Sequence, residues 1–492
     1  MPRVLFATPE LAPWMKSGGL GEISRSLPAA LLEAGVDVRI LVPAYPSLLA
    51  AFPEAHLLAE VAEPGGRLPS ARLLEARLEC GVPLLLIDCP ALYRRSGSAY
   101  QDADGRDFAD NALRFGLLSK IAAVLGSRGS PCSWRPDIVH CNDWPCGLAP
   151  AFLHFERRMA KKAATLMTVH NLAFQGIFPR TTLDDLGLPP ESFAMDGVEF
   201  WGSLSFMKAG LQFAGRITTV SPRYAGEIQD EEFGAGLAGL LRWRKEDLTG
   251  ILNGIDTRAW NPATDPLLAQ RYDFAHIEAK AANKAALQKL MGLREDASVP
   301  LLGSVSRITQ QKGLDLLPLI AEEIARLPAQ LVLLGQGDKS LERQLAQLAE
   351  RFPGQFAISI GFNEEQAHLI EGGADIFLMP SRFEPCGLNQ MYSLRYGTPP
   401  VVRATGGLAD TVVGCTPASQ AKGTANGFMF ERATAEELLD AIRRAATAWH
   451  DKALWRKLQK SGMKQDFSWA RTAARYRALY RELVLGRNTV LP

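Results

Sequence analysis

The chain has 492 residues, 47% of them hydrophobic and 22% charged, which is the composition of an ordinary globular protein. This length exceeds what one hydrophobic core usually supports, so we expect two domains of comparable size. Lysine and arginine number 54 against 53 for aspartate and glutamate. This balance argues against nucleic acid or an anionic membrane as the main partner, because both require a concentrated basic surface.

The N-terminus has no basic segment followed by a long apolar run, and no later stretch is long enough to span a bilayer. We therefore expect a cytoplasmic protein. The seven cysteines form no CxxC pair, so they are predicted to be reduced thiols that build neither disulfides nor a zinc site.

Short runs rich in valine, isoleucine and leucine alternate with segments of helical period along the chain, which predicts an α/β fold with mainly parallel sheets. A strand at 4–8, a helix at 20–34 and a strand at 36–42 open the series. Further strands are predicted at 84–88, 137–141, 165–169 and 217–220, and a second series at 301–306, 331–334, 356–360, 376–380 and 400–403.

Turn-forming residues without periodicity fill 253–266, which places the crossover between two domains near residue 250. We predict domains at 1–250 and 251–465. A final helix at 466–492 is predicted to pack back across the N-terminal domain, with packing on its own domain as the alternative. Its apolar face is formed by Trp469, Ala473, Tyr476, Tyr480 and Leu483.

Lysine and glycine residues follow the first strand directly, at Lys16, Gly18 and Gly19. Glycines let the backbone approach a ligand, helix N-terminal amides favour an anion, and lysine adds a mobile positive donor, so a diphosphate would fit here. A turn that only needs positive φ angles is the alternative. Neither GxGxxG nor GK[ST] is completed, which argues against NAD and against ATP as a phosphoryl donor.

Polar residues also follow two later strands of the first series, Asp143 after 137–141 and His170 after 165–169. Ligands of open parallel sheets bind beyond the carboxyl ends of strands, so both are candidates to hold a hydroxyl-rich substrate. Helix capping is the alternative for each. His140 lies before the loop and is interpreted as structural.

In the second series, a loop carrying Arg307 and Lys312 follows a strand and is predicted to open a helix, where the two cations can converge on phosphates. A solvated basic turn is the alternative. The loop containing Glu384, Cys386 and Gly387 also joins a strand to a helix, with Gly387 predicted in its first turn, and forms a corner suited to anions and hydroxyls.

Asp102 and Asp104 spell the DxD of metal-dependent glycosyltransferases, but they lie in a polar loop before a helix expected near Phe108. We interpret them as solvated and expect no metal and no cofactor, because Lys16, Arg307 and Lys312 can offset a leaving diphosphate.

The sequence resembles the bacterial glycogen synthase and plant starch synthase family over nearly its whole length. The segments that carry the resemblance are 16–21, 100–107 with 110–111, 140–144, 168–172, 253–256, 306–313, 381–387 and 405–410. The resemblance implies a glycosyltransferase-B fold, with two Rossmann-like domains facing a central cleft. The N-terminal domain would be catalytic and hold the acceptor, and the C-terminal domain would bind the nucleotide-sugar.

The resemblance also implies roles for residues. Lys16, Gly18 and Gly19 would contact the donor, Arg307 and Lys312 would clamp its diphosphate, and His170 and Asp143 would orient the glucose and the acceptor. Glu384 would lie near the donor sugar with Cys386 and Gly387, and Asn253 and Phe362 would approach the nucleoside. Three positions depart from the pattern: Glu22 stands where many members have Asp, Asn389 where some bacterial members have Thr, and Tyr392 where some related transferase families have a second Glu.

The activity so implied is retaining transfer of glucose from ADP-glucose to the nonreducing 4-OH of an α-1,4-glucan, with ADP-glucose and glucan as partners and domain closure to exclude water. The choice of ADP over UDP comes from the resemblance alone. Three alternatives stay open: an α-glucan phosphorylase with pyridoxal phosphate, a silent glucan-binding protein, and a transferase with a small acceptor. The sequence does not determine the oligomeric state.

Overall fold

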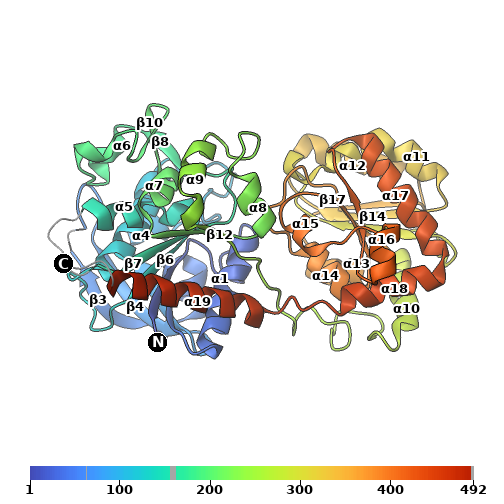
Figure 1. The fold of residues 1–492 in the computed structure, drawn as a ribbon, viewed down its shortest axis with the longest axis horizontal. Coiled ribbons are helices and arrows are strands. Elements are labelled where there is room, and N and C mark those ends of the chain that lie inside the picture. Colours follow the sequence, from blue (N-terminus) through green and yellow to red (C-terminus); the bar gives the residue numbers. More distant parts are fainter. Residues whose placement is uncertain (63, 156–161, 489–492) are drawn as a thin grey trace. The chain divides into compact units, whose positions relative to one another are not determined.

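The computed structural model describes residues 1–62, 64–155 and 162–488 and divides the chain into two compact units (Figure 1). Unit 1 comprises Met1–Gly254 together with Trp469–Pro492, and unit 2 comprises Ile255–Ser468. Each unit is built around a mainly or fully parallel sheet with helices on both faces, so the predicted α/β class is confirmed. In the described part of the chain, no helix combines the length and the apolar character needed to cross a membrane.

Unit 1 contains a nine-stranded sheet in which β1 is central. Its strands, in spatial order, are β12 (Leu248–Gly250), β11 (Arg216–Thr219), β7 (Ala164–Val169), β6 (Ile138–Asn142), β1 (Arg3–Ala7), β2 (Asp37–Pro43), β5 (Pro83–Asp88), β4 (Ala71–Arg77) and β3 (His56–Val61). All neighbours are parallel except β3 with β4 and β4 with β5. A small antiparallel sheet is formed by β8 (Ile177–Pro179), β10 (Ser203–Ser205) and β9 (Glu199–Phe200).

The antiparallel strands β3 and β4, at one end of the sheet, were not predicted from the sequence. β1 and β5 are almost fully buried and therefore show continuous apolar runs, whereas β3 is largely exposed and contains His56 and Glu60 among its apolar residues. A half-exposed edge strand lacks the uninterrupted apolar signal on which the prediction depended.

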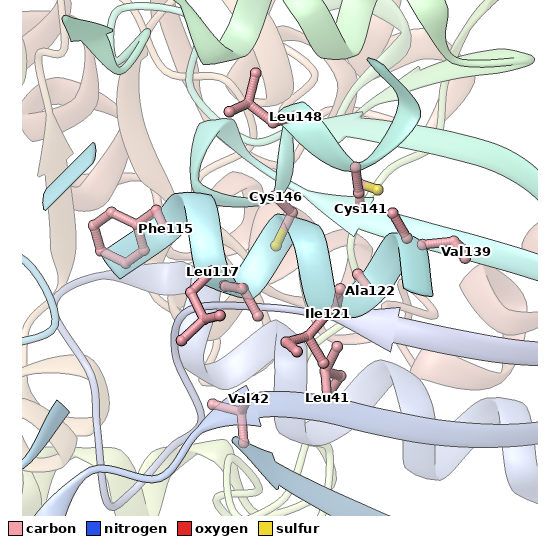
Figure 2. Close-up of a cluster of buried hydrophobic side chains, with 14 of the residues drawn as sticks. Leu41, Val42, Phe115, Leu117, Ile121, Ala122, Val139, Cys141, Cys146 and Leu148 are labelled. Carbon is pink, nitrogen blue, oxygen red and sulfur yellow. The ribbon is translucent and has the colours of Figure 1, made fainter. Parts of the chain in front are cut away.

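The helices of unit 1 cover both faces of the large sheet. They are α1 (Gly19–Glu33), α2 (Pro46–Ala51), α3 (Pro90–Tyr93), α4 (Asn111–Leu125), η1 (Trp144–Cys146), α5 (Leu148–Phe155), α6 (Thr182–Asp185), η2 (Pro190–Ser192), α7 (Phe206–Phe213), α8 (Pro222–Glu227), α9 (Ala238–Trp243), η3 (Lys245–Asp247) and α19 (Trp469–Asn488). On one face, α4 packs on β1 and β2, and Figure 2 shows Ile121 of α4 beside Leu41 of β2.

On the other face, α19 lies beside α1 (Figure 1), so the last helix of the chain is part of the first unit. Trp469, Ala473, Tyr476 and Tyr480 are all buried there against the sheet and α1. The Tyr480 hydroxyl lies 2.8 Å from Nδ1 of the fully buried His140, whose Nε2 lies 2.6 Å from the Thr168 hydroxyl. His140 is therefore a satisfied core histidine, and burial lowers its pKa to about 3.

Unit 2 contains a six-stranded parallel sheet. Its strands, in spatial order, are β15 (Phe356–Ile360), β14 (Gln330–Gly335), β13 (Leu301–Val305), β16 (Ile376–Met379), β17 (Pro400–Arg403) and β18 (Phe428–Phe430). Its helices are η4 (Ile277–Ala279), α10 (Lys280–Leu290), η5 (Gln310–Lys312), η6 (Leu314–Leu316), η7 (Pro318–Ile320), α11 (Ala321–Arg326), α12 (Lys339–Arg351), α13 (Glu364–Gly373), α14 (Asn389–Arg395), α15 (Gly406–Thr411), α16 (Pro417–Lys422), α17 (Ala435–His450) and α18 (Lys452–Met463).

Three local predictions differ from the structure. The loop after β13 leads into three 3₁₀ turns before α11, because Gly313 adopts a left-handed conformation (φ +67°) and Pro318 cannot donate the amide that an α-helix needs. Gly387 lies before α14 instead of in its first turn, and α4 begins at Asn111 instead of near Phe108.

Candidate active site

The strand order defines a switch point in each sheet. In unit 1 the chain passes from β1 to β2 on one side, while β6 pairs with β1 on the other side. In unit 2, β13 has β14 on one side and β16 on the other. Loops that leave two such strands diverge and open a crevice at their carboxyl ends, which is where open α/β sheets bind ligands. Most of the predicted site residues fall in loops at these carboxyl ends.

In unit 1, the loop after β1 ends in the glycine turn at the start of α1. The Lys16 ammonium pairs with the Glu22 carboxylate at 2.6 Å, and both side chains are more than a third exposed, at 37% and 39%. An ion pair this exposed contributes little stability, so Lys16 can exchange Glu22 for an incoming anion. Glu22, which differs from the Asp of many family members, is therefore in direct contact with Lys16.

Not all of the amides of this turn are open to a ligand. Ser17 and Gly18 donate their amides to the carboxylate of Glu10, at 2.8 and 3.3 Å. The sequence reasoning missed Glu10, and only its closeness to the glycine turn hinted at a role. Among the described residues, the amides of Gly19 and Leu20, at the first positions of α1, have no acceptor. These two amides remain available to bind an anion.

The ends of β6 and β7 bring Asp143 and His170 together. The His170 amide donates to the Asp143 carboxylate at 3.4 Å, and Asp143 has φ 60° and ψ 178°, a combination that non-glycine residues rarely adopt. Such strain costs on the order of 1–3 kcal/mol and is concentrated at functional sites. Burial raises the pKa of Asp143 to about 8, although the amides of His170 and Asn171 oppose the shift.

The imidazole of His170 is oriented by its neighbour. Its Nε2 lies 3.1 Å from Oδ1 of Asn142, whose amide nitrogen in turn donates to the Ala7 carbonyl at 3.0 Å, so Nε2 carries the proton. The buried Nδ1 is left as an acceptor with no partner among the described residues. Burial lowers the pKa of His170 to about 3. His170 is therefore neutral and can accept a hydrogen bond from a ligand hydroxyl.

In unit 2, the loops after β13 and β16 are joined by an ion pair. Lys312 Nζ lies 2.6 Å from Oε2 of Glu384, which also accepts from the Ser381 hydroxyl at 3.0 Å. The Lys312 and Glu384 side chains are only 17% and 7% exposed, so the alternative of a solvated basic turn does not hold for Lys312. Arg307, in contrast, is exposed, and its guanidinium has no hydrogen-bond or ion-pair partner within the described ranges.

The loop around Glu384 is fixed by close backbone contacts. A Cβ atom at Gly406 would lie 1.9 Å from the Glu384 carbonyl oxygen, and one at Gly407 would lie 2.0 Å from that of Cys386. Gly387 has φ +72°, and Asn389 donates to the Val305 carbonyl at 2.6 Å, which ties α14 to the end of β13. Only glycine permits this approach of α15 to the loop.

The remaining predicted residues lie outside these two clusters. Asn253 belongs to unit 1 and is buried, with Oδ1 unpartnered in the described part of the chain, whereas Phe362 follows β15 in unit 2 and is 64% exposed. The ring of Tyr392 stacks on that of Trp260, with 3.8 Å between the ring centroids, so Tyr392 is a packing residue.

The Asp102 carboxylate accepts the amides of Asp104 and Arg106, at 2.9 and 3.0 Å, and so caps its own loop. Within residues 1–62, 64–155 and 162–488, no group of three or more histidine, cysteine, aspartate or glutamate side chains could hold a metal ion.

Comparisons with known proteins agree with this arrangement. A family model described as the starch synthase catalytic domain matches residues 3–243, and one described as glycosyl transferases group 1 matches residues 292–462. Two sheets of this order, each with polar loops at its switch point, define a two-domain glycosyltransferase of the GT-B class.

The chain is 57% identical over 484 residues to glycogen synthase of Dechloromonas aromatica, covering 98% of this chain and 99% of the relative. It is 54% identical over 490 residues to glycogen synthase of Nitrosomonas eutropha, covering 99% and 97%. The catalytic domain of starch synthase IV from Arabidopsis thaliana, bound to ADP and acarbose, superposes with a TM-score of 0.86 at 30% identity, covering 98% and 99%. The chain belongs to the glycogen synthase family and is a hexosyltransferase.

Proposed function

We propose that this enzyme transfers glucose with retention from ADP-glucose to the nonreducing 4-OH of an α-1,4-glucan and releases ADP. The observation that carries this proposal is the pairing of Lys312 with Glu384 at the switch point of unit 2, on the same loop as Arg307, whose guanidinium has no partner among the described residues. A cation held by a carboxylate and a free guanidinium are suited to a diphosphate, whose negative charge grows as its bond to glucose breaks.

In this proposal each unit binds a different part of the substrates. Unit 2 holds the diphosphate through Arg307 and Lys312, while Glu384 orients the glucosyl group with Oε1, the oxygen that Lys312 and Ser381 leave open. Unit 1 accepts a sugar hydroxyl at Nδ1 of His170 and binds the donor at the amides of Gly19 and Leu20. The departing phosphate oxygen takes the proton of the attacking hydroxyl on the same face of the sugar.

The choice of ADP-glucose is supported by the starch synthase structure that contains ADP and by the exposed ring of Phe362, which can stack on a purine. The test is nucleotide release by the purified protein, with a glucan acceptor and either ADP-glucose or UDP-glucose. We expect a higher kcat/KM with ADP-glucose, and equal or reversed preference would reject this donor. A phosphorylase would instead release glucose 1-phosphate from glucan and inorganic phosphate.

We further propose that no metal is required, because Arg307 and Lys312 supply positive charge at the leaving group. Activity should therefore survive exhaustive chelation. Loss of activity with chelator and its recovery with Mn²⁺ would contradict this expectation. The cytoplasmic location remains a prediction, which cell fractionation would test.

A further inference from the structure

Glu10 is only 3% exposed, and its carboxylate accepts hydrogen bonds that have no part in the proposed reaction. Its Oε2 accepts the amides of Ser17 and Gly18, and its Oε1 accepts the hydroxyl of Tyr100 at 2.8 Å. Burial raises the pKa of Glu10, and these donors oppose the shift. A buried carboxylate is costly, so its full set of donors points to a defined task.

The glycine turn depends on this carboxylate. The preceding loop is held by its own backbone, because Leu11 and Met15 exchange two hydrogen bonds of 2.9 Å and the Ala12 amide donates to the Gly21 carbonyl at 3.1 Å. The amides of Ser17 and Gly18 are instead held by Glu10. Glu10 therefore sets the peptide planes that lead into α1, and with them the direction of the first amides of that helix.

The space beside Gly18 is open. A Cβ atom there would meet no atom within 4 Å, and its φ of −166° is extended backbone that any residue adopts. Neither packing within the described chain nor backbone conformation requires glycine at this position. In the proposed function, the donor approaches the chain at this open face of the turn.

Tyr100 is itself firmly placed. Its carbonyl accepts the Asn111 side chain at 2.9 Å and the Phe108 amide at 3.1 Å, and its ring packs beside Phe115 and Trp144. Burial raises its pKa well above the usual value, so the hydroxyl keeps its proton and donates to Glu10. The polar stretch that begins at Tyr100 thus supports the glycine turn.

We propose that Glu10 is a positioning residue for the nucleotide-sugar donor. It takes the amides of Ser17 and Gly18, Tyr100 holds its second oxygen, and the amides of Gly19 and Leu20 are thereby aimed at the donor. This inference rests on the proposed function and adds to it the hydrogen bonds that keep the glycine turn in its binding geometry.

Four variants test the proposal: Glu10→Ala, Glu10→Gln, Tyr100→Phe and the double variant Glu10→Gln/Tyr100→Phe. In Glu10→Gln, the glutamine can accept the turn amides with its oxygen and donate its NH₂ to the Tyr100 oxygen, so this variant should still hold the glycine turn. In the double variant, phenylalanine removes that acceptor, so the turn should lose its support. We expect Glu10→Ala and the double variant to lose about 100-fold in kcat/KM for ADP-glucose, the cost of misplacing a binding group by about 1 Å. Each other single variant should lose less than about tenfold.

Further readouts separate positioning from a structural role. The KM for glucan should stay within about twofold of wild type. Wild-type donor kinetics in Glu10→Ala and in the double variant would overturn this inference and leave the proposed function standing. Equal increases in donor and glucan KM, with a lower Tm for the double variant, would show a merely structural role and also overturn it. A wild-type protein that neither binds nor transfers from nucleotide-glucose would overturn the proposed function and this inference with it.

Discussion

Arg307 and Lys312 lie on one loop but differ in their surroundings, so substituting each with Ala separates catalysis from folding. Arg307 is exposed and unpaired in the described structure, and its loss should change the free energy of unfolding by no more than about 0.5 kcal/mol. Removal of Lys312 leaves the buried carboxylate of Glu384 without its counter-ion, although the Ser381 hydroxyl still donates to it.

The cost for Lys312→Ala can be worked out from this contact. Removing one partner of a buried ion pair typically costs about 3–5 kcal/mol. Because 17% of the Lys312 side chain is exposed and Ser381 remains, we expect about 2–3 kcal/mol. For a unit the size of Ile255–Ser468, this lowers Tm by about 5–10 °C.

Both variants should lose about two to three decades in kcat/KM, since each removes a donor to a developing anion. Steady-state kinetics and calorimetry of the two proteins provide the measurement. The matched control is Lys312→Ala/Glu384→Gln, which removes the uncompensated charge and should melt above Lys312→Ala while staying inactive. Near-wild-type turnover in both single variants would refute the clamp, and equal Tm values for them would refute the stabilising ion pair.

Three further predictions concern other positions. Gly18→Ala should keep the wild-type Tm, because its Cβ meets no atom within 4 Å, but raise the KM for the donor; an unchanged KM would place the donor elsewhere. Burial lowers the pKa of His140 to about 3, so the unfolded chain binds the extra proton first and stability falls as the pH drops below about 6.5. From pH 7 to 5 this histidine should lower the free energy of unfolding by about 2 kcal/mol. Denaturant unfolding of His140→Gln should show a weaker dependence of this free energy on pH. Although burial alone would lower the pKa of His368, its hydrogen bonds to Asp265 and Glu364 raise it to about 9. The stabilisation of the folded state by protonated His368 is therefore fully present below about pH 6.5 and is lost as the pH rises through 9. A stability profile of His368→Gln at alkaline pH that matches wild type would contradict this prediction.

Much of the fold could be predicted because it depends on local patterns. The buried strands β1, β5 and β14 contain continuous apolar runs, and α19 shows its buried stripe at helical spacing. The loops at the carboxyl ends of these strands could be identified for the same reason. The exposed edge strand β3 was missed because His56 and Glu60 interrupt its apolar residues. The 3₁₀ turns after β13 were missed because they depend on the conformation of single residues.

The sequence by itself determined the α/β class, the order of the elements and the polar residues at the strand ends, since all three follow from spacing along the chain. Only the tertiary structure decided which of those residues meet. Lys312 and Glu384 are 72 positions apart, and Tyr100 and Glu10 are 90 apart, so no periodicity links them. Their pairing, their burial and the neutral state of His170 arise from the packing of neighbouring loops at a sheet's switch point, because burial and ionisation depend on all surrounding atoms and not on residue type.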